Sequence, residues 1–257
     1  MIGQNIIISH NICEYDIRKA NISVLFDAGM IDEKTYNTLY MADRMERQKY
    51  VGLLQLKDEK YTKVLQEGIE KARNVFLKRN GIDKSNIIRI SNDAIYTHSI
   101  EAHHTKITPH VEFVKKSSFT SYMKVEFNSY IKGYSYEIFY GFDPILQKEW
   151  YKVLGIKDTV QFHDNFMQLI LMIFNILETS GMRDGLKACM DVIRAYENRE
   201  YPIEFYRPFD SRGKYLYNGY YVDDIDGFNS IGDDSVNFNH NLNILYAIKN
   251  NILRCII

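Results

Sequence analysis

Residues 12–29 read ICEYDIRKANISVLFDAG, and residues 86–98 read NIIRISNDAIYTH. Each stretch leads from an apolar, β-branched run into a single aspartate, Asp16 in the first and Asp93 in the second. A charged carboxylate at the end of a buried strand is costly unless it has a partner or a function. The elements between these two aspartates therefore decide both the fold and the position of any site.

The chain between the two aspartates has helical spacing. Apolar residues recur every three or four positions over residues 58–82, and Gly81 stands where a helix C-terminal cap is expected. Shorter helices are predicted from residue 23 onward, with Asp32 as an N-cap. A strand, a long amphipathic helix and a second strand place both strands in one sheet, and this order brings the two carboxylates to one face.

The remaining sequence is first β-rich and then helical. Period-two alternation over residues 110–117, 121–132 and 134–142 predicts an antiparallel meander. Helical patterns follow over residues 161–181, 184–200 and 239–254. The predicted fold class is α+β, with an antiparallel sheet and packed helices in residues 1–145 and a helical, tyrosine-rich region in residues 146–257.

Composition limits the class of protein. The 257 residues carry 32 Lys plus Arg against 33 Asp plus Glu, so a free-standing nucleic-acid binder that depends on overall positive charge is not favoured, although a local basic groove is compatible. Many isoleucines and asparagines, together with many tyrosines and phenylalanines, favour an AT-rich genome, as in some phages and low-GC bacteria. Three distant cysteines form neither a metal motif nor a disulfide framework, which predicts a reducing compartment.

No membrane partner is expected. No signal peptide is recognised at the start of the chain, because residues 1–11 lack a basic segment. The longest apolar run, residues 166–177, is shorter than the roughly 20 residues that span a bilayer. These features predict a cytoplasmic protein, in the host cytoplasm if a phage encodes it.

The stretch around Asp16 resembles motif A of right-hand polymerase palms, in which a metal-binding aspartate precedes a turn and a helix. The pattern is similar both to family A DNA polymerases and to reverse transcriptases. Residues 68–98 resemble the palm helix, loop and motif C strand of family A polymerases, and the whole resemblance covers residues 6–98. It implies that Asp16 and Asp93 bind Mg²⁺ or Mn²⁺, and that four residues lie beside the incoming nucleotide: Arg18, Lys19, Asn21 and Ser23.

The implied activity is nucleotidyl transfer within a replication or transcription complex. Two carboxylates on adjacent strand ends can hold a pair of divalent ions roughly 3.5–4 Å apart. A 3′-hydroxyl would attack the α-phosphate of a nucleoside triphosphate, and Arg18 or Lys19 would balance the phosphate charge. In such polymerases, the helix that contacts the nucleotide carries Lys and Arg residues that face the triphosphate. The corresponding residues here would be Arg44, Arg47 and Lys49, but their spacing does not place them on one helix face.

Two departures keep other functions open. Ala94 stands where family A has an acid, and Asn92 stands where a two-aspartate motif has one. The alternative is therefore a non-catalytic, palm-derived subunit that docks on partner proteins through its tyrosine-rich C-terminal surface. A third possibility is a plain α+β binding module in which Asp16 and Asp93 are turn or cap residues.

Other candidate groups lie outside the two motifs. The strand after motif C interleaves basic and aromatic residues that could hold a nucleic-acid backbone and stack bases, or simply form a sheet surface: Lys115, Lys116, Phe119, Tyr122 and Lys124. Four histidines with Glu101 could bind zinc or form a solvated loop: His98, His103, His104 and His110. Glu14 shares the strand face of Asp16, as a third metal ligand or a solvent-facing neighbour. Residues 201–222, with Arg207, Arg212 and Lys214, could form a binding loop or a protein interface.

Overall fold

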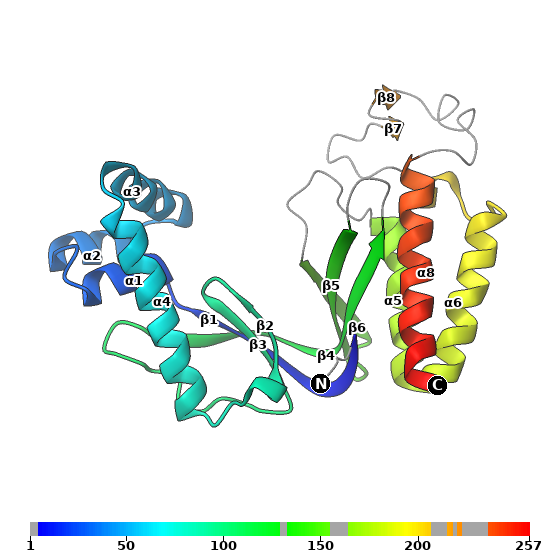
Figure 1. The fold of residues 1–257 in the computed structure, drawn as a ribbon, viewed down its shortest axis with the longest axis horizontal. Coiled ribbons are helices and arrows are strands. Elements are labelled where there is room, and N and C mark those ends of the chain that lie inside the picture. The colour runs from blue at the N-terminus through cyan, green and yellow to red at the C-terminus, as the bar shows by residue number, and fades with distance from the viewer. Residues whose placement is uncertain (1–4, 129–132, 155–163, 207–214, 218–219, 223–235) are drawn as a thin grey trace. The chain divides into compact units, whose positions relative to one another are not determined.

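The computed structural model describes residues 5–128, 133–154, 164–206, 215–217, 220–222 and 236–257 (Figure 1). The chain divides into two compact units, a first unit of residues 11–118 and a second unit of residues 1–10 and 119–257. Strands β1 (Ile6–Ile17) and β4 (Phe113–Asn128) each contribute residues to both units. The division differs from the boundary expected at residue 145, because the strand that follows β4 shares its core with the C-terminal helices.

The strand pairing of the first unit brings Asp16 and Asp93 to the same end of the sheet. Its strand order is β2-β3-β1-β4, in which β2 (Ile87–Ser91) and β3 (Ala94–His98) form a hairpin. Strand β1 pairs antiparallel with β3, so that Asp16 lies opposite Ala94. The hairpin turn consists of Asn92 and Asp93, and Asn92 adopts φ 49°, a left-handed conformation that asparagine tolerates. Asp93 therefore sits at the end of the sheet where β1 also ends.

Four α-helices lie between β1 and β2 in the first unit, as the blue to cyan part of Figure 1 shows: α1 (Ala20–Asp27), α2 (Glu33–Met41), α3 (Arg44–Lys57) and α4 (Lys60–Arg79). The expected N-cap is confirmed, since Asp32 Oδ1 accepts a hydrogen bond from the backbone N–H of Thr35 at 2.7 Å. Gly81, at φ 62°, follows the last residues of α4, as expected for a helix C-terminus. A short 3₁₀ turn, Lys84–Asn86, leads into β2.

The core of the first unit determines which way Asp16 faces. Tyr15 is buried and its ring packs on Phe76 of α4, with ring centroids 5.3 Å apart. Phe76 also packs on Phe113 of β4 at 4.2 Å. Because successive side chains of a strand point to opposite faces, the Tyr15–Phe76 contact directs Asp16 to the face away from α4.

Helices α1 and α4 approach each other closely at Gly68. A Cβ atom at this position would lie 2.3 Å from Cγ1 of the buried Val24. We expect Gly68→Leu to lower the free energy of unfolding by about 1–3 kcal/mol, because the new side chain overpacks this contact. Urea denaturation followed by circular dichroism measures the loss.

A matched double variant tests whether Val24 is the obstacle. Val24→Ala removes the opposing methyl group, so Gly68→Leu combined with Val24→Ala should lose less stability than the sum of the two single changes. Strict additivity would show that the close approach of α1 and α4 does not limit the residue at position 68.

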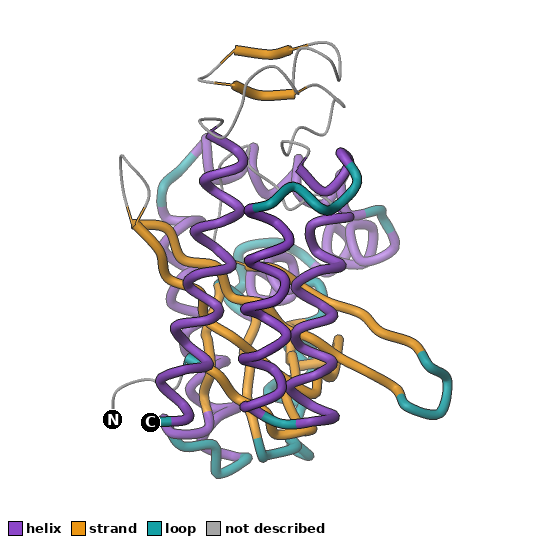
Figure 2. Tube along the Cα trace, turned by 90° about the vertical axis from the view of Figure 1, so that its right-hand side faces the viewer, coloured by secondary structure: helices purple, strands orange, loops and turns teal. Residues whose placement is uncertain are grey.

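The second unit pairs an antiparallel sheet with helices. Its strand order is β4-β5-β6, with β5 (Gly133–Asp143) and β6 (Lys148–Leu154). Figure 2 shows three long helices running side by side: α5 (Asp164–Ser180), α6 (Met182–Glu197) and α8 (Val236–Ile256). Alternate residues of β5 and the inner faces of these helices form one apolar cluster. The remaining described elements are a 3₁₀ turn and two short strands, Ile203–Tyr206, β7 (Tyr215–Tyr217) and β8 (Tyr220–Val222).

The α+β class with a helical C-terminal part is confirmed. Two details of the meander differ from the prediction: residues 113–128 form one continuous strand, and β6 was not expected. Among the described helices, none combines the length and apolar character needed to cross a bilayer. Cys13, Cys189 and Cys255 are free thiols.

Candidate functional site

A pocket of about 410 Å³ in the first unit contains both aspartates. The end of β1 contributes Asp16, the β2–β3 turn contributes Asp93, and β4 contributes Lys116. The chain between β1 and α1 and one face of α3 complete the lining. Residues far apart in sequence therefore converge at the end of the sheet, as the order of elements predicted.

Asp16 is held with one oxygen buried and the other near a cation. Its Oδ1 atom is buried and accepts no hydrogen bond, whereas Oδ2 lies 3.9 Å from Lys116 Nζ. The backbone N–H of Ile17 donates to the carbonyl of Asp93 at 3.3 Å, which ties the strand end to the hairpin turn. Burial and the neighbouring Asp93 carboxyl raise the pKa of Asp16 to about 6, against the lowering effect of Lys116. Such an environment is typical of functional carboxylates.

This pKa predicts an unusual effect of Asp16→Asn on stability. Between about pH 4 and pH 6 the folded protein holds a proton that the unfolded chain has released, so this group's contribution to stability falls as the pH rises. In metal-free buffer at pH 7.5 we expect Asp16→Asn to be more stable than the wild type by about 1–3 kcal/mol. Urea denaturation at pH 7.5 and at pH 4 measures the difference, which should vanish at the lower pH.

The urea concentrations at which Asp16→Asn and the wild type are half unfolded at pH 7.5 test this prediction. An Asp16→Asn protein that unfolds at a lower urea concentration than the wild type at pH 7.5 would show that the ionised carboxylate is well accommodated. A functional site that is strained in the absence of its ligand would instead show the predicted gain.

Cationic side chains surround the two carboxylates. Five of them line the pocket, so the cations exceed the two carboxylates by three: Arg18, Lys19, Arg44, Arg47 and Lys116. Guanidinium groups pair well with phosphate oxygens, and an excess of positive charge in a pocket attracts polyanions. The pocket therefore suits a ligand that carries several phosphate charges together with a divalent cation.

The spacing of Arg44, Arg47 and Lys49 in the sequence assigned Arg44 and Arg47 to no common helix face. In the structure they share one face of α3 with Gln48 and Val51, at the helical spacing i, i+3, i+4, i+7. The missing signal was the start of the helix: Asp43 Oδ1 accepts a hydrogen bond from the Glu46 N–H at 2.8 Å and begins α3 at Arg44. The Asp43 N-cap can be read from the sequence, whereas the burial of Val51, which orients this face, is seen only in the structure.

The turn after Asp16 also joins the pocket to α2. Lys19 adopts φ 50°, donates a hydrogen bond to the Tyr40 carbonyl and lies 3.6 Å from the centroid of the Tyr40 ring. Arg18 forms an exposed ion pair with Glu112 at 3.7 Å. Both side chains have partners, yet both line the pocket, as does Asn21.

Ser23 requires a correction. Its side chain is fully buried, and its hydroxyl donates to the carbonyl of Arg18 at 3.3 Å instead of lining the pocket. Helix α1 begins at Ala20, so Ser23 falls on the inner side of the first turn. The position beside the nucleotide that the resemblance implied for Ser23 is not supported.

The predicted nucleic-acid surface on β4 is also corrected for its aromatic members. Phe119 and Tyr122 are 2% and 4% exposed and pack on Phe139, with ring centroids 5.3 and 4.9 Å apart. Buried rings have no face on which a base can stack. Of the three lysines, Lys115 pairs with Glu101 at 2.8 Å, Lys124 pairs with Glu126, and only Lys116 lines the pocket.

The histidines do not converge. His98 Nε2 lies 2.9 Å from the Ser85 carbonyl, whereas His110 Nδ1 lies 2.7 Å from Asp27 Oδ1. Within the described part of the chain, no three His, Cys, Asp or Glu side chains form a metal-binding group. The zinc alternative is therefore not supported for His98, His103, His104 and His110.

Glu14 is a buried neighbour of Asp16 and not a solvent-facing one. It is 5% exposed, and its Oε1 accepts a hydrogen bond from the Tyr96 hydroxyl at 3.1 Å. This bond satisfies one of the two carboxylate oxygens. Arg207, Arg212 and Lys214 lie outside the described residues, so the expected C-terminal binding loop stays a prediction.

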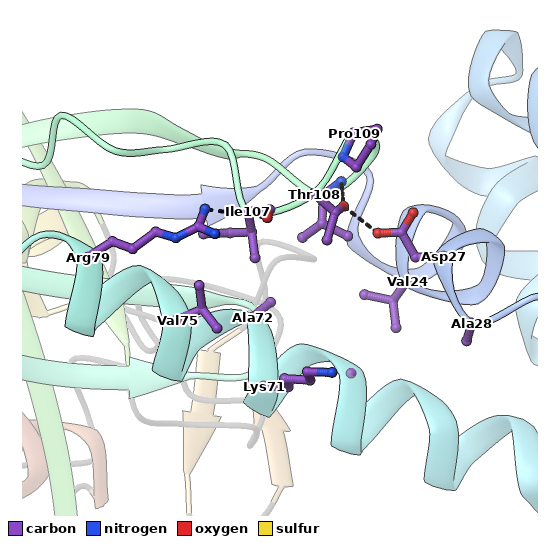
Figure 3. A pocket seen from close by; sticks show the side chains of 12 residues that line it. Val24, Asp27, Ala28, Lys71, Ala72, Val75, Arg79, Ile107, Thr108 and Pro109 are labelled. Atoms are coloured by element: carbon purple, nitrogen blue, oxygen red, sulfur yellow. Dashed lines mark hydrogen bonds between the residues drawn. The ribbon is translucent and has the colours of Figure 1, made fainter.

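A second pocket of about 510 Å³ lies between α1, α4 and residues 107–111 (Figure 3). Val24, Val75 and Ile107 give it an apolar lining, and Lys71 stands at one side. The Thr108 hydroxyl donates to Asp27, and Arg79 donates to the Lys106 carbonyl, so its polar groups hold the loop in place. No cluster of three metal-binding side chains gathers there among the described residues.

The comparisons place the chain among phage proteins. A model of the family described as bacteriophage PBS1 gene 130 protein matches residues 4–254. The chain belongs to this family. The match covers nearly the whole sequence, including every residue of the aspartate pocket, and it confirms the expected phage origin. No curated protein matches the chain. The family description names no activity, so the palm resemblance stays a prediction.

Proposed function

We propose that this phage protein binds a nucleoside triphosphate with a divalent metal ion in the aspartate pocket and transfers its nucleotidyl group to a nucleic-acid 3′-hydroxyl. One observation carries the proposal. Asp16, at the end of a central strand, and Asp93, in the adjacent hairpin turn, face one pocket in which five cationic side chains gather.

The topology supports the same function. In the strand order β2-β3-β1-β4, the strand that ends in Asp16 lies next to the hairpin that carries Asp93. This is the placement that motifs A and C of a polymerase palm would require. It adds weight to a resemblance that rested on two short sequence motifs.

The carboxylates fit a hard divalent cation. Asp16 Oδ1 has no hydrogen-bond partner, and Mg²⁺ and Mn²⁺ prefer oxygen ligands, commonly one or two carboxylates together with substrate phosphates. When bound, such an ion would polarise the phosphate and stabilise the developing charge. Asp16 and Asp93 would hold it.

The protein's own side chains would position the triphosphate. Arg44 and Arg47, one turn apart on α3, can contact phosphate oxygens from the side of the pocket formed by that helix. The bond from the α-phosphorus to the 3′ oxygen forms as the bond to pyrophosphate breaks, and the hydroxyl proton passes to solvent. Because the protein does little covalent chemistry in such a transfer, positioning and charge supply most of the catalysis.

Primer extension tests the proposal. Wild-type protein with Mg²⁺ or Mn²⁺, a primed template and labelled nucleotides should incorporate nucleotide. The double variant Arg44→Ala, Arg47→Ala should raise the KM for nucleotide by about 10–100-fold, since each removes a charge-assisted contact. Lys57→Ala, an exposed change on α3 outside the pocket, is the matched control. Unchanged nucleotide affinity in the double variant would remove the support given by the pocket.

A second candidate function is a non-catalytic subunit of a phage replication or transcription complex. Four large apolar side chains on α2 and α3 are exposed by 59–86%: Met41, Met45, Leu53 and Leu56. Helical spacing places Met45, Leu53 and Leu56 toward the same side of α3, and a contiguous apolar patch of this kind is typical of a protein interface. Well-folded wild-type protein that binds no nucleotide and incorporates none would favour this function over catalysis.

A further inference from the structure

The aspartate pocket offers few ligands for two metal ions. Besides Asp16 and Asp93, no third His, Cys, Asp or Glu completes a metal-binding group in the described chain. The positions flanking Asp93 hold Asn92 and Ala94, and the nearby Glu14 accepts a hydrogen bond from Tyr96. A single Mg²⁺ held by one or two carboxylates and substrate phosphates is a complete arrangement.

Lys116 places a positive charge beside Asp16. Its Nζ lies 3.9 Å from Asp16 Oδ2 and it lines the pocket with both aspartates. The side chain enters from β4, so the backbone of the sheet fixes its base. Lys115, its neighbour in sequence, pairs instead with Glu101 and is not part of the pocket lining. Strand alternation thus directs only one of the two lysines to the carboxylates.

A lysine at this distance has two consequences for cations. It neutralises part of the carboxylate charge, and it repels a second divalent ion that would approach Asp16 from the same side. An ammonium group also supplies hydrogen-bond donors to phosphate oxygens without requiring oxygen ligands of its own.

We propose that the Lys116 ammonium replaces a second divalent ion in this pocket, so that the protein binds one metal ion between Asp16 and Asp93. This inference rests on the proposed function for its biological role, but the number of ions is measured without substrate. It changes the two-ion expectation derived from the sequence into a site with one ion and one lysine.

Electron paramagnetic resonance titration of the full chain with Mn²⁺ counts the ions. The number of Mn²⁺ ions bound in the pocket is the number bound by the wild type minus the number bound by the double variant Asp16→Asn, Asp93→Asn. This subtraction removes ions bound by other acidic segments. We expect a difference of one ion per chain. Lys116→Met should bind that ion about tenfold more tightly, because a neighbouring positive charge is removed. Lys115→Met should leave the affinity unchanged.

Charge reversal gives the sharpest result. Lys116→Asp adds a third carboxylate where the ammonium stood. The number of Mn²⁺ ions bound per chain, relative to the aspartate double variant, should then rise from one to two. Lys115→Asp should leave this number at one. Two ions in the wild type would overturn the inference and leave the proposed function intact. No difference between the wild type and the aspartate double variant would also overturn the inference, whereas the proposed function is decided separately by the primer-extension assay. Circular dichroism of each variant establishes that it is folded.

Discussion

Asp16→Asn and Asp93→Asn should each lower the rate of nucleotide incorporation by at least about 10²-fold. The amide keeps the size of the carboxylate but removes the charge that would hold a divalent cation and balance the pocket's five cationic side chains. Single-turnover primer extension at saturating nucleotide measures the effect as a change in rate constant, separate from any change in nucleotide affinity.

The matched control for this prediction lies in the same turn. Asn92→Gly keeps Asp93 and suits the left-handed conformation at φ 49°, so it should incorporate nucleotide at close to the wild-type rate. If both aspartate variants also retained the wild-type rate, the chemistry would have to be sought elsewhere in the chain. Asp16→Asn should combine this loss of activity with a gain in stability at pH 7.5, a pair of effects that a purely structural aspartate would not produce.

Phe76→Ala is expected to lower the free energy of unfolding by about 3–5 kcal/mol. The ring of Phe76 is fully buried and packs on both Tyr15 and Phe113, so its removal leaves a cavity between α4, β1 and β4. Hydrogen exchange of peptides from residues 60–79 reports the loss directly in the helix concerned.

Lys63→Ala, an exposed change on the same helix, controls for helix content and should alter stability by no more than about 0.5 kcal/mol. Protection of residues 60–79 that is equal in Phe76→Ala and the wild type would show that the Tyr15–Phe76–Phe113 packing does not stabilise the first unit. Because Tyr15 precedes Asp16, loosened packing should also lower the affinity of the pocket for Mn²⁺.

Sequence predicted the convergence of Asp16 and Asp93 because strand patterns, helix spacing and the turn residues all act locally. The helix ends marked by Asp32 and Gly81 were also predicted correctly, since a helix cap depends on a few adjacent residues. Ser23 and Phe119 show the weakness. Ser23 is buried because α1 begins at Ala20, a boundary that the sequence pattern did not fix. Phe119 is buried because its ring packs on Phe139, which lies on another strand.

The sequence does not show which of the two adjacent lysines, Lys115 or Lys116, faces the aspartate pocket. Both residues belong to one basic run, and which of them faces Asp16 depends on the register of β4, which a one-residue shift would reverse. The division into two units differs from the boundary expected at residue 145 for a similar reason. Alternating strands look alike in sequence, whichever core they cover, so β5 and β6 gave no sign that they pack with the C-terminal helices.

The interrupted second unit has a consequence for synthesis on the ribosome. Residues 1–10 belong to it, and the backbone N–H of Lys124 donates to the Asn5 carbonyl at 2.8 Å, yet residues 11–118 emerge between them. Domains generally fold as units as they are translated. All residues of the first unit are therefore synthesised before residues 1–10 can pair with their partners from residue 119 onward, so the second unit is the last to be completed.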